Sequence, residues 1–188
     1  MSSQSAPLRT SLESLAVLAA REAPGLPWPL RIGAVRGDLP DINVWLALAV
    51  QEHPHHTLAH QYWASALADQ AAQGSLGEPC LWFCRTTMLG LVRLVCQPKA
   101  VGAGALELAP AWALYQQYRA MPQIGLLTEP ADCETRIQTL LSSAALPARL
   151  WTDTYLAALA QSAGLRLVTF DRDFMRFGLT HCLVLPTQ

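Results

Sequence analysis

The segment from Leu165 to Phe174 is the feature that most constrains the fold of this chain. It reads Leu-Arg-Leu-Val-Thr-Phe-Asp-Arg-Asp-Phe, an apolar run typical of a buried strand that ends in two carboxylates, Asp171 and Asp173. In open α/β sheets, ligands bind just beyond the carboxyl ends of the parallel strands. Acidic side chains at that place, with no Lys beside them, indicate a hard cation held by oxygen ligands.

Two further acidic residues stand in comparable contexts. Asp41 opens the segment Asp-Ile-Asn-Val-Trp-Leu, and Asp153 lies in Leu-Trp-Thr-Asp-Thr-Tyr-Leu. Taken singly, each acid is more simply explained as a capping or first-turn charge. Taken together, they match the way a metal-dependent phosphodiesterase gathers carboxylates from distant segments. The joint pattern therefore predicts a metal site.

Strands and helices alternate along the chain. The predicted strands are 35–39, 78–84, 124–127, 165–169 and 182–185. The predicted helices are 44–50, 57–73, 86–97, 111–121, 131–145 and 153–163, with Thr86 as the cap of the third. This alternation predicts a three-layer α/β/α fold with a mainly parallel central sheet, in which Asp41 and Asp171 end neighbouring strands.

Composition limits the class of protein. The chain has 188 residues, of which 52% are hydrophobic and 14% charged, so one domain with an appendage is expected. The apolar runs are too short to span a bilayer, and no compact signal pattern opens the chain. Five cysteines without framework spacing favour a reduced, cytoplasmic protein. The net charge of −1 argues against tight non-specific binding of nucleic acid.

The first 38 residues differ from the rest of the chain. A possible amphipathic helix from Ser11 to Arg21 is followed by three closely spaced prolines. We therefore expect residues 1–38 to form an N-terminal extension, either flexible or a docked helix, and residues 39–188 to form the main domain.

Three segments of the chain together resemble the PIN-domain ribonucleases: Leu39–Leu46, Thr152–Ala160 and Leu167–Phe174. Two more, Glu52–His56 and Phe83–Leu94, narrow the resemblance to the VapC-like toxins of bacterial type II toxin–antitoxin systems. Each motif alone is weak, whereas their order and spacing are fairly specific. The resemblance extends from about residue 39 to residue 185, and residues 39–188 are identified with the PIN domain.

The resemblance implies a metal-dependent endoribonuclease that hydrolyses RNA phosphodiester bonds with Mg²⁺ or Mn²⁺. Asp41, Asp153 and Asp171 correspond to the core metal ligands. Asp173 is expected to lie in the second shell or to bind a second metal. Asn43 is a possible accessory residue, which would hydrogen-bond a ligand or a metal-bound water.

One position departs from the family pattern. PIN domains commonly carry a Glu in the helix after the second strand, where this chain has Met88. A thioether sulfur is a poor ligand for Mg²⁺, so a second metal site is in doubt. The neighbouring Thr87 is a possible accessory residue that would hold a water there.

The resemblance also implies partners. The substrate would be RNA, and a cognate antitoxin would insert a peptide across the acidic pocket. Contact with DNA would be indirect, through the antitoxin, and no membrane is involved. VapC-like proteins commonly dimerise, so a homodimer is expected.

Two alternative functions remain open at this stage. Met88 allows a degenerate, non-catalytic PIN domain that serves as a binding module. A HAD-like phosphatase also has an acid at the end of its first strand, but its chemistry needs a second Asp where this chain has Asn43.

Other patterns have simpler explanations. His56 and His60 have the i,i+4 spacing of a zinc pair, but no third ligand is near in sequence, so exposed turn and cap residues are expected. Four aromatic residues are expected in the core rather than against RNA bases, namely Trp63, Trp82, Trp112 and Tyr115.

Overall fold

A five-stranded parallel sheet forms the centre of the protein, with the strand order β3-β2-β1-β4-β5. The computed structural model describes residues 35–75, 77–143 and 145–187. The strands are β1 (Asp38–Pro40), β2 (Leu81–Phe83), β3 (Ile124–Leu126), β4 (Arg166–Thr169) and β5 (Cys182–Val184). The predicted parallel sheet is confirmed, and β1 lies at its centre between β2 and β4.

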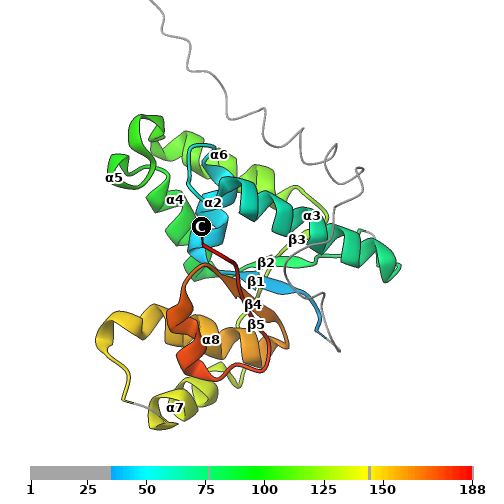
Figure 1. Ribbon diagram of the computed structural model, residues 1–188, viewed down its shortest axis with the longest axis vertical. Helices are drawn as coiled ribbons and strands as arrows, with labels where there is room; N and C mark the ends of the chain where they lie inside the picture. The colour runs from blue at the N-terminus through cyan, green and yellow to red at the C-terminus, as the bar shows by residue number, and fades with distance from the viewer. Residues whose placement is uncertain (1–34, 76, 144, 188) are drawn as a thin grey trace, which may run out of the picture.

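Helices cover both faces of the sheet, which makes the predicted three layers (Figure 1). One layer consists of α2 (Ile42–Ala49), α3 (His56–Ala72), α4 (Arg85–Leu94) and α6 (Leu108–Arg119). The other contains α7 (Cys133–Ser143) and α8 (Trp151–Ala163). Shorter elements are α5 (Pro98–Val101), η1 (Gly102–Gly104), η2 (Ala148–Leu150) and η3 (Arg172–Phe177).

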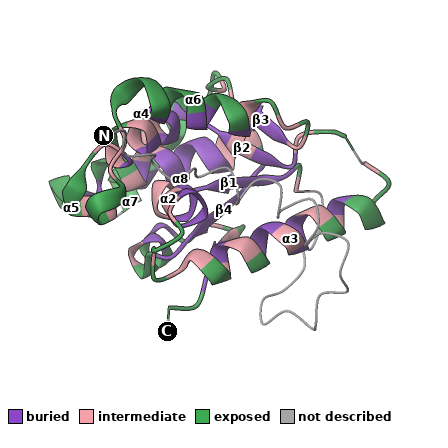
Figure 2. Cartoon of the chain, turned by 90° about the horizontal axis from the view of Figure 1, so that it is seen from above, coloured by how far each residue is buried: buried purple, intermediate pink, exposed green. Residues whose placement is uncertain are grey.

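Each helical layer encloses its own hydrophobic cluster. Under α2, α3, α4 and α6 the cluster is rich in aromatic rings, and Trp45 stacks on Phe83 with ring centroids 3.7 Å apart. Under α7 and α8 the cluster is mostly aliphatic and includes Leu156 and Leu167. The central strands β1 and β4 are wholly buried between the two layers, whereas the outer side of α3 is exposed (Figure 2).

Strand β1 is shifted from its predicted position and includes Pro40. The strand was expected at 35–39 because proline cannot donate to a ladder, yet β1 runs from Asp38 to Pro40. Its pairing with β4 extends over all three residues, whereas its pairing with β2 is recorded only at Asp38. Because Pro40 lacks an N–H group, β1 separates from β2 just before the candidate site.

The predicted cap of α4 is wrong by two residues. Cys84, not Thr86, is the N-cap, and the helix begins at Arg85. The Oγ1 atom of Thr87 accepts a hydrogen bond from the backbone N–H of Cys84 at 3.0 Å. This is half of a capping box, in which the third residue of the helix bonds back to the cap.

A buried ion pair joins β1 to β4 at the amino ends of the two strands. Arg166 donates from Nε and Nη2 to the two carboxylate oxygens of Asp38, each at 2.9 Å. The hydroxyl of Tyr62 on α3 donates to the same carboxylate at 2.8 Å. Asp38 is fully buried and Arg166 nearly so, which makes the pair part of the interior.

Two predictions concern the chain outside the sheet. Residues 1–34 of the expected N-terminal extension lie outside the described residues, and so does the possible helix from Ser11 to Arg21. Among the helices that the structure describes, none combines the length and apolarity needed to cross a bilayer.

Candidate active site at the carboxyl edge of the sheet

Asp41 and Asp171 follow the ends of neighbouring strands, as predicted. Asp41 comes directly after β1 and is the N-cap of α2, where its Oδ1 accepts the backbone N–H of Ile42 at 2.6 Å. Asp171 comes two residues after β4 and is the N-cap of η3. Because β1 and β4 pair in parallel, their carboxyl ends bring these two acids to the same edge of the sheet.

Thr169, the last residue of β4, connects the two strand ends. Its Oγ1 donates to Oδ2 of Asp41 at 2.9 Å and accepts the backbone N–H of Asp171 at 3.0 Å. The side-chain amide of Asn43 also donates to Asp41 Oδ2, at 2.6 Å, and its carbonyl accepts the backbone N–H of Phe170 at 3.2 Å. The predicted accessory residue Asn43 therefore orients Asp41 and fixes the backbone leading to Asp171.

Asp153 reaches the same region from the opposite helical layer. It lies in the first turn of α8, as predicted, and is partly exposed. Its pKa is raised, first by burial and then by the negative charges of Asp171 and Asp173. The helix N-terminus favours a carboxylate at this position.

Asp41 is the most strongly perturbed acid of the site. It is only 4% exposed, and burial raises its pKa to about 6, with the charges of Asp153 and Asp171 adding to the increase. The hydrogen bonds from Thr169 and Ile42 act in the opposite direction. Three carboxylates within electrostatic reach of one another repel unless a cation or protons compensate their charge.

This electrostatic cost leads to a prediction about stability and pH. Well below the ordinary Asp pKa of 3.8, Asp41 is protonated in both states, but from there up to about pH 6 the unfolded chain loses the proton first, so unfolding becomes easier as the pH rises. With EDTA present, the free energy of unfolding of the parent should therefore fall, relative to Asp41→Asn, by about 2 kcal/mol between pH 4 and pH 7. Urea denaturation at the two pH values measures this difference, and parallel pH curves for the two proteins would contradict it.

Asp173 lies beside the acidic cluster but has cationic partners. Its Oδ2 accepts from Nη1 of Arg149 at 2.7 Å, and its Oδ1 accepts from Nε of Arg176 at 3.0 Å. These two hydrogen bonds lower the pKa of Asp173, with the bond from Arg149 contributing most. Both carboxylate oxygens are thus engaged by arginines, and the role of Asp173 as a metal ligand stays a prediction.

Met88 and Thr87 lie at the start of α4. Met88 is 7% exposed and packs in the aromatic-rich cluster. Thr87 is fully buried, and its hydroxyl donates to the backbone carbonyl of Cys84 at 3.1 Å while accepting from the N–H of the same residue. Thr87 thus holds the start of the helix in place, and its predicted contact with a water remains untested.

The histidines differ from the sequence prediction of exposed residues. His56 and His60 are half-buried, and their Nδ1 and Nε2 atoms lie 2.8 and 3.3 Å from the backbone carbonyls of Ala47 and Leu48. Those carbonyls belong to the last turn of α2, where no partner within the helix is available. The two side chains therefore cap the carboxyl end of α2, whose amino end is capped by Asp41.

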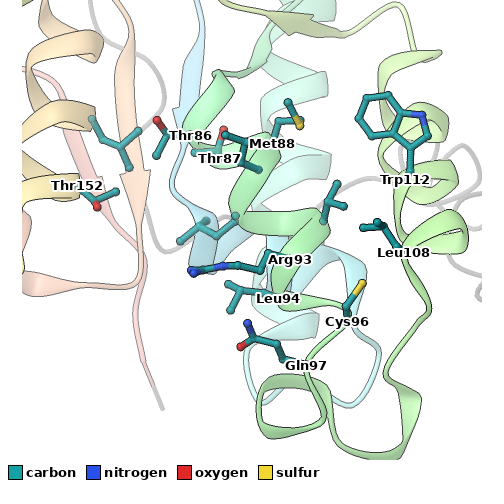
Figure 3. Close-up of a pocket in the computed structure, with 15 residues that line it drawn as sticks. Thr86, Thr87, Met88, Arg93, Leu94, Cys96, Gln97, Leu108, Trp112 and Thr152 are labelled. Atoms are coloured by element: carbon teal, nitrogen blue, oxygen red, sulfur yellow. The ribbon is translucent and has the colours of Figure 1, made fainter.

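An apolar groove of about 960 Å³ lies along α4. Figure 3 shows Leu108 and Trp112 of α6 on one side of α4 and Thr152 of α8 on the other. Trp112 is 43% exposed, so the prediction that it belongs to the core is wrong. Leu89 and Leu108 are exposed by more than half, at 63% and 69%.

The donor set of the acidic cluster fits a hard cation. Asp41, Asp153 and Asp171 offer carboxylate oxygens, the ligands preferred by Mg²⁺ and Mn²⁺, and their mutual repulsion favours a positive charge between them. In the described part of the chain, no three acidic, histidine or cysteine side chains already converge on one point. Binding an ion would thus require the three carboxylates to move closer together, and the oxygens of Asp41 can bind a cation while they accept their present hydrogen bonds.

The sequence prediction did not include two residues that the structure places at the site. Thr169 was assigned only to the strand, although a hydroxyl two residues before an acid, at a strand end, is a usable signal. Arg149 was assigned to a loop, and it contacts Asp173, a residue 24 positions later. That contact depends on the arrangement of η2 and η3, which no local pattern reveals.

Comparison with known proteins identifies the family. The PIN domain profile matches residues 39–178. Ribonuclease VapC41 of Mycobacterium tuberculosis, from strains CDC 1551 / Oshkosh and ATCC 25618 / H37Rv, is 33% identical over 143 residues, which cover 73% of this chain and 91% of that protein. With the parallel sheet and the acids at its carboxyl edge, these matches show that the chain belongs to the PIN-domain family.

Proposed function

We propose that this chain is a metal-dependent endoribonuclease that serves as the toxin of a toxin–antitoxin pair. The observation that carries the proposal is the presence of Asp41, Asp153 and Asp171 within electrostatic reach at one edge of the sheet. The similarity to proteins named Ribonuclease VapC41 supports RNA as the substrate.

The three aspartates would hold the divalent ion, Mg²⁺ or Mn²⁺. When bound, such an ion lowers the pKa of water and neutralises charge on the scissile phosphate. The part of Thr169 and Asn43 is to orient Asp41, because both donate to its Oδ2 atom. At the N-terminus of α2, the N–H of Ile42 would hold Oδ1 of Asp41 in place.

Removal of divalent ions tests the proposed activity directly. The purified chain should cleave RNA with Mg²⁺ or Mn²⁺, lose cleavage in excess EDTA, and regain it when the ion is restored, because no residue is assigned as a covalent nucleophile. Gel analysis of a labelled RNA measures this result. Cleavage that persists unchanged in EDTA would contradict the assignment of the acids.

The alternative function is a degenerate PIN domain that binds without catalysis. Met88, which stands where relatives of the family commonly have Glu, is the observation that favours it. The same experiment separates the two functions, since a binding module would leave RNA intact at every concentration of divalent ion. The HAD-like alternative has little support, because Asn43 replaces its required acid and instead donates to Asp41.

The biological partners follow from the toxin assignment. The cognate antitoxin would cover the acidic pocket with a peptide and would contact operator DNA itself, so that contact of this chain with DNA is indirect. The proposal places the protein in the cytoplasm, in agreement with five cysteines that form no disulfide. Co-purification with the product of the adjoining gene would test the pairing.

We also propose that the chain forms a homodimer through the groove along α4. A two-fold interface must be self-complementary, and this face offers both a hollow and protruding apolar side chains, Leu89 and Leu108. Light scattering of the purified protein tests this proposal, and a monomer at all concentrations would refute it.

A further inference from the structure

We propose that Arg149 and Arg176, bridged by Asp173, form a subsite that binds the phosphate backbone of the RNA strand beside the acidic cluster. This inference rests on the proposed ribonuclease function, because it assigns a binding site to the substrate of that same activity. In this role Asp173 serves as the anchor of two arginines rather than as a metal ligand.

The geometry of the bridge supports a fixed pair of cationic groups. Arg149 comes from η2, at the start of α8, whereas Asp173 and Arg176 come from η3. One carboxylate receives both guanidinium groups, with distances of 2.7 Å to Arg149 and 3.0 Å to Arg176. The shared anchor brings together two charges that would otherwise be far apart in the chain.

The exposure of the three side chains favours binding over a purely structural role. The side chains of Arg149 and Arg176 are 62% and 57% exposed, against 25% for Asp173. Exposed ion pairs add little to stability. Each guanidinium carries five N–H donors, and the bridge uses one nitrogen from each, so donors remain for phosphate oxygens.

The bridge between Arg149, Asp173 and Arg176 lies beside the acids that are proposed to cleave the RNA. Asp173 raises the pKa of Arg149 most, and Asp171 and Asp153 contribute to the same increase, which places this guanidinium within the field of the acidic cluster. The two arginines and Asp173 together carry one net positive charge, which lies beside the negative charges of the acidic cluster. A phosphate held there would lie next to the phosphate presented to the acids.

RNA binding measured without cleavage tests the proposal. In an Asp41→Asn background with EDTA, the anisotropy of fluorescein-labelled oligouridylate is followed against KCl concentration. Arg149→Ala and Arg176→Ala should each weaken binding and reduce the slope of log K against log[salt] by about 0.7, the value for one phosphate contact to a single strand. Arg136→Ala is the matched control, because Arg136 on α7 is an exposed arginine paired with Asp132.

The outcomes decide between three roles for these residues. Unchanged binding and an unchanged slope in both arginine variants would overturn the proposal. The same variants are also tested with an oligoglutamate peptide. If they bind this peptide more weakly than the parent while the salt slope for RNA is unchanged, the proposal is overturned and the arginines are assigned to an acidic protein partner. The role of Asp173 is tested by calorimetric titration of Mn²⁺ into the protein with Asp41 intact. Asp173→Asn should leave the affinity for Mn²⁺ unchanged. A loss of this affinity would overturn the assignment of Asp173 as an anchor and make it a metal ligand.

The design separates this inference from the proposed function. Binding is measured in a protein that cannot cut and in the absence of metal, so a chain that fails to cleave RNA can still show the expected loss of slope. Conversely, if the protein cleaves RNA but its RNA affinity is the same in the parent and in both arginine variants, the subsite alone is refuted.

Discussion

Replacing Asp41 by Asn is expected to lower the rate of RNA cleavage by at least about a hundredfold while the protein remains folded. The substitution removes one of the negative charges that would hold the divalent ion, without changing the size of the side chain. The fold is retained because Asn is as good an N-cap as Asp, so the bond from the N–H of Ile42 is preserved. Initial rates on a labelled RNA, at saturating Mn²⁺, measure the effect, with circular dichroism as the check on folding.

The control for this experiment is Asp132→Asn. Asp132 is an exposed acid paired with Arg136 near α7, so its loss changes the net charge equally without touching the strand ends. Asp171→Asn should reproduce the loss seen with Asp41→Asn, because both acids end neighbouring strands. Near-parental cleavage by a well-folded Asp41→Asn protein would refute the proposed mechanism.

Replacing Arg166 by Met should reduce the free energy of unfolding by about 3–5 kcal/mol. Methionine keeps much of the aliphatic volume but leaves the fully buried Asp38 without its main cationic partner. The hydroxyl of Tyr62 still donates one hydrogen bond, which offsets only part of the loss. Urea denaturation at neutral pH measures the change.

Two further variants separate this effect from the loss of a charge in general. Arg136→Ala breaks an exposed pair and should change stability by no more than about 1 kcal/mol. In the double variant Asp38→Leu with Arg166→Met, much of the stability should return, since an apolar pair can replace a buried ion pair at little cost. A loss in the double variant equal to the sum of the two single losses would show that the residues act independently.

The sequence predicted the sheet and the positions of the acids well, for a physical reason. Strand β4 lies in a mostly apolar segment between Gly164 and Asp171, and Gly164 ends α8 in the left-handed conformation, as expected of a helix-terminal glycine. Parallel strands covered by helices on both faces require such runs. Because Asp41 and Asp171 follow strand ends, locating the strands also located these two acids.

What the sequence could not reveal depends on contacts between distant segments. Oγ1 of Thr169 bonds to Asp41, a residue 128 positions earlier, and Arg166 pairs with Asp38 over the same separation. No local pattern distinguishes Arg166 from a solvent-exposed residue of a strand. The exposure of Trp112 was missed for a similar reason, since the groove beside it arises only when α4 and α6 are placed together.

The central position of β1 has a consequence for the time at which the protein becomes active. During synthesis, β1, β2 and β3 leave the ribosome before β4. Strand β1, which precedes Asp41, can therefore pair with β4 only after most of the chain has been made. Until then one edge of β1 has no neighbour in the sheet, and an unpaired edge invites association with other chains. Contacts between such distant residues form slowly, because a long loop must close first. A ribosome-bound fragment that ends before Asp153 therefore carries only one of the three acids, which would prevent a nascent nuclease from cutting the message that encodes it.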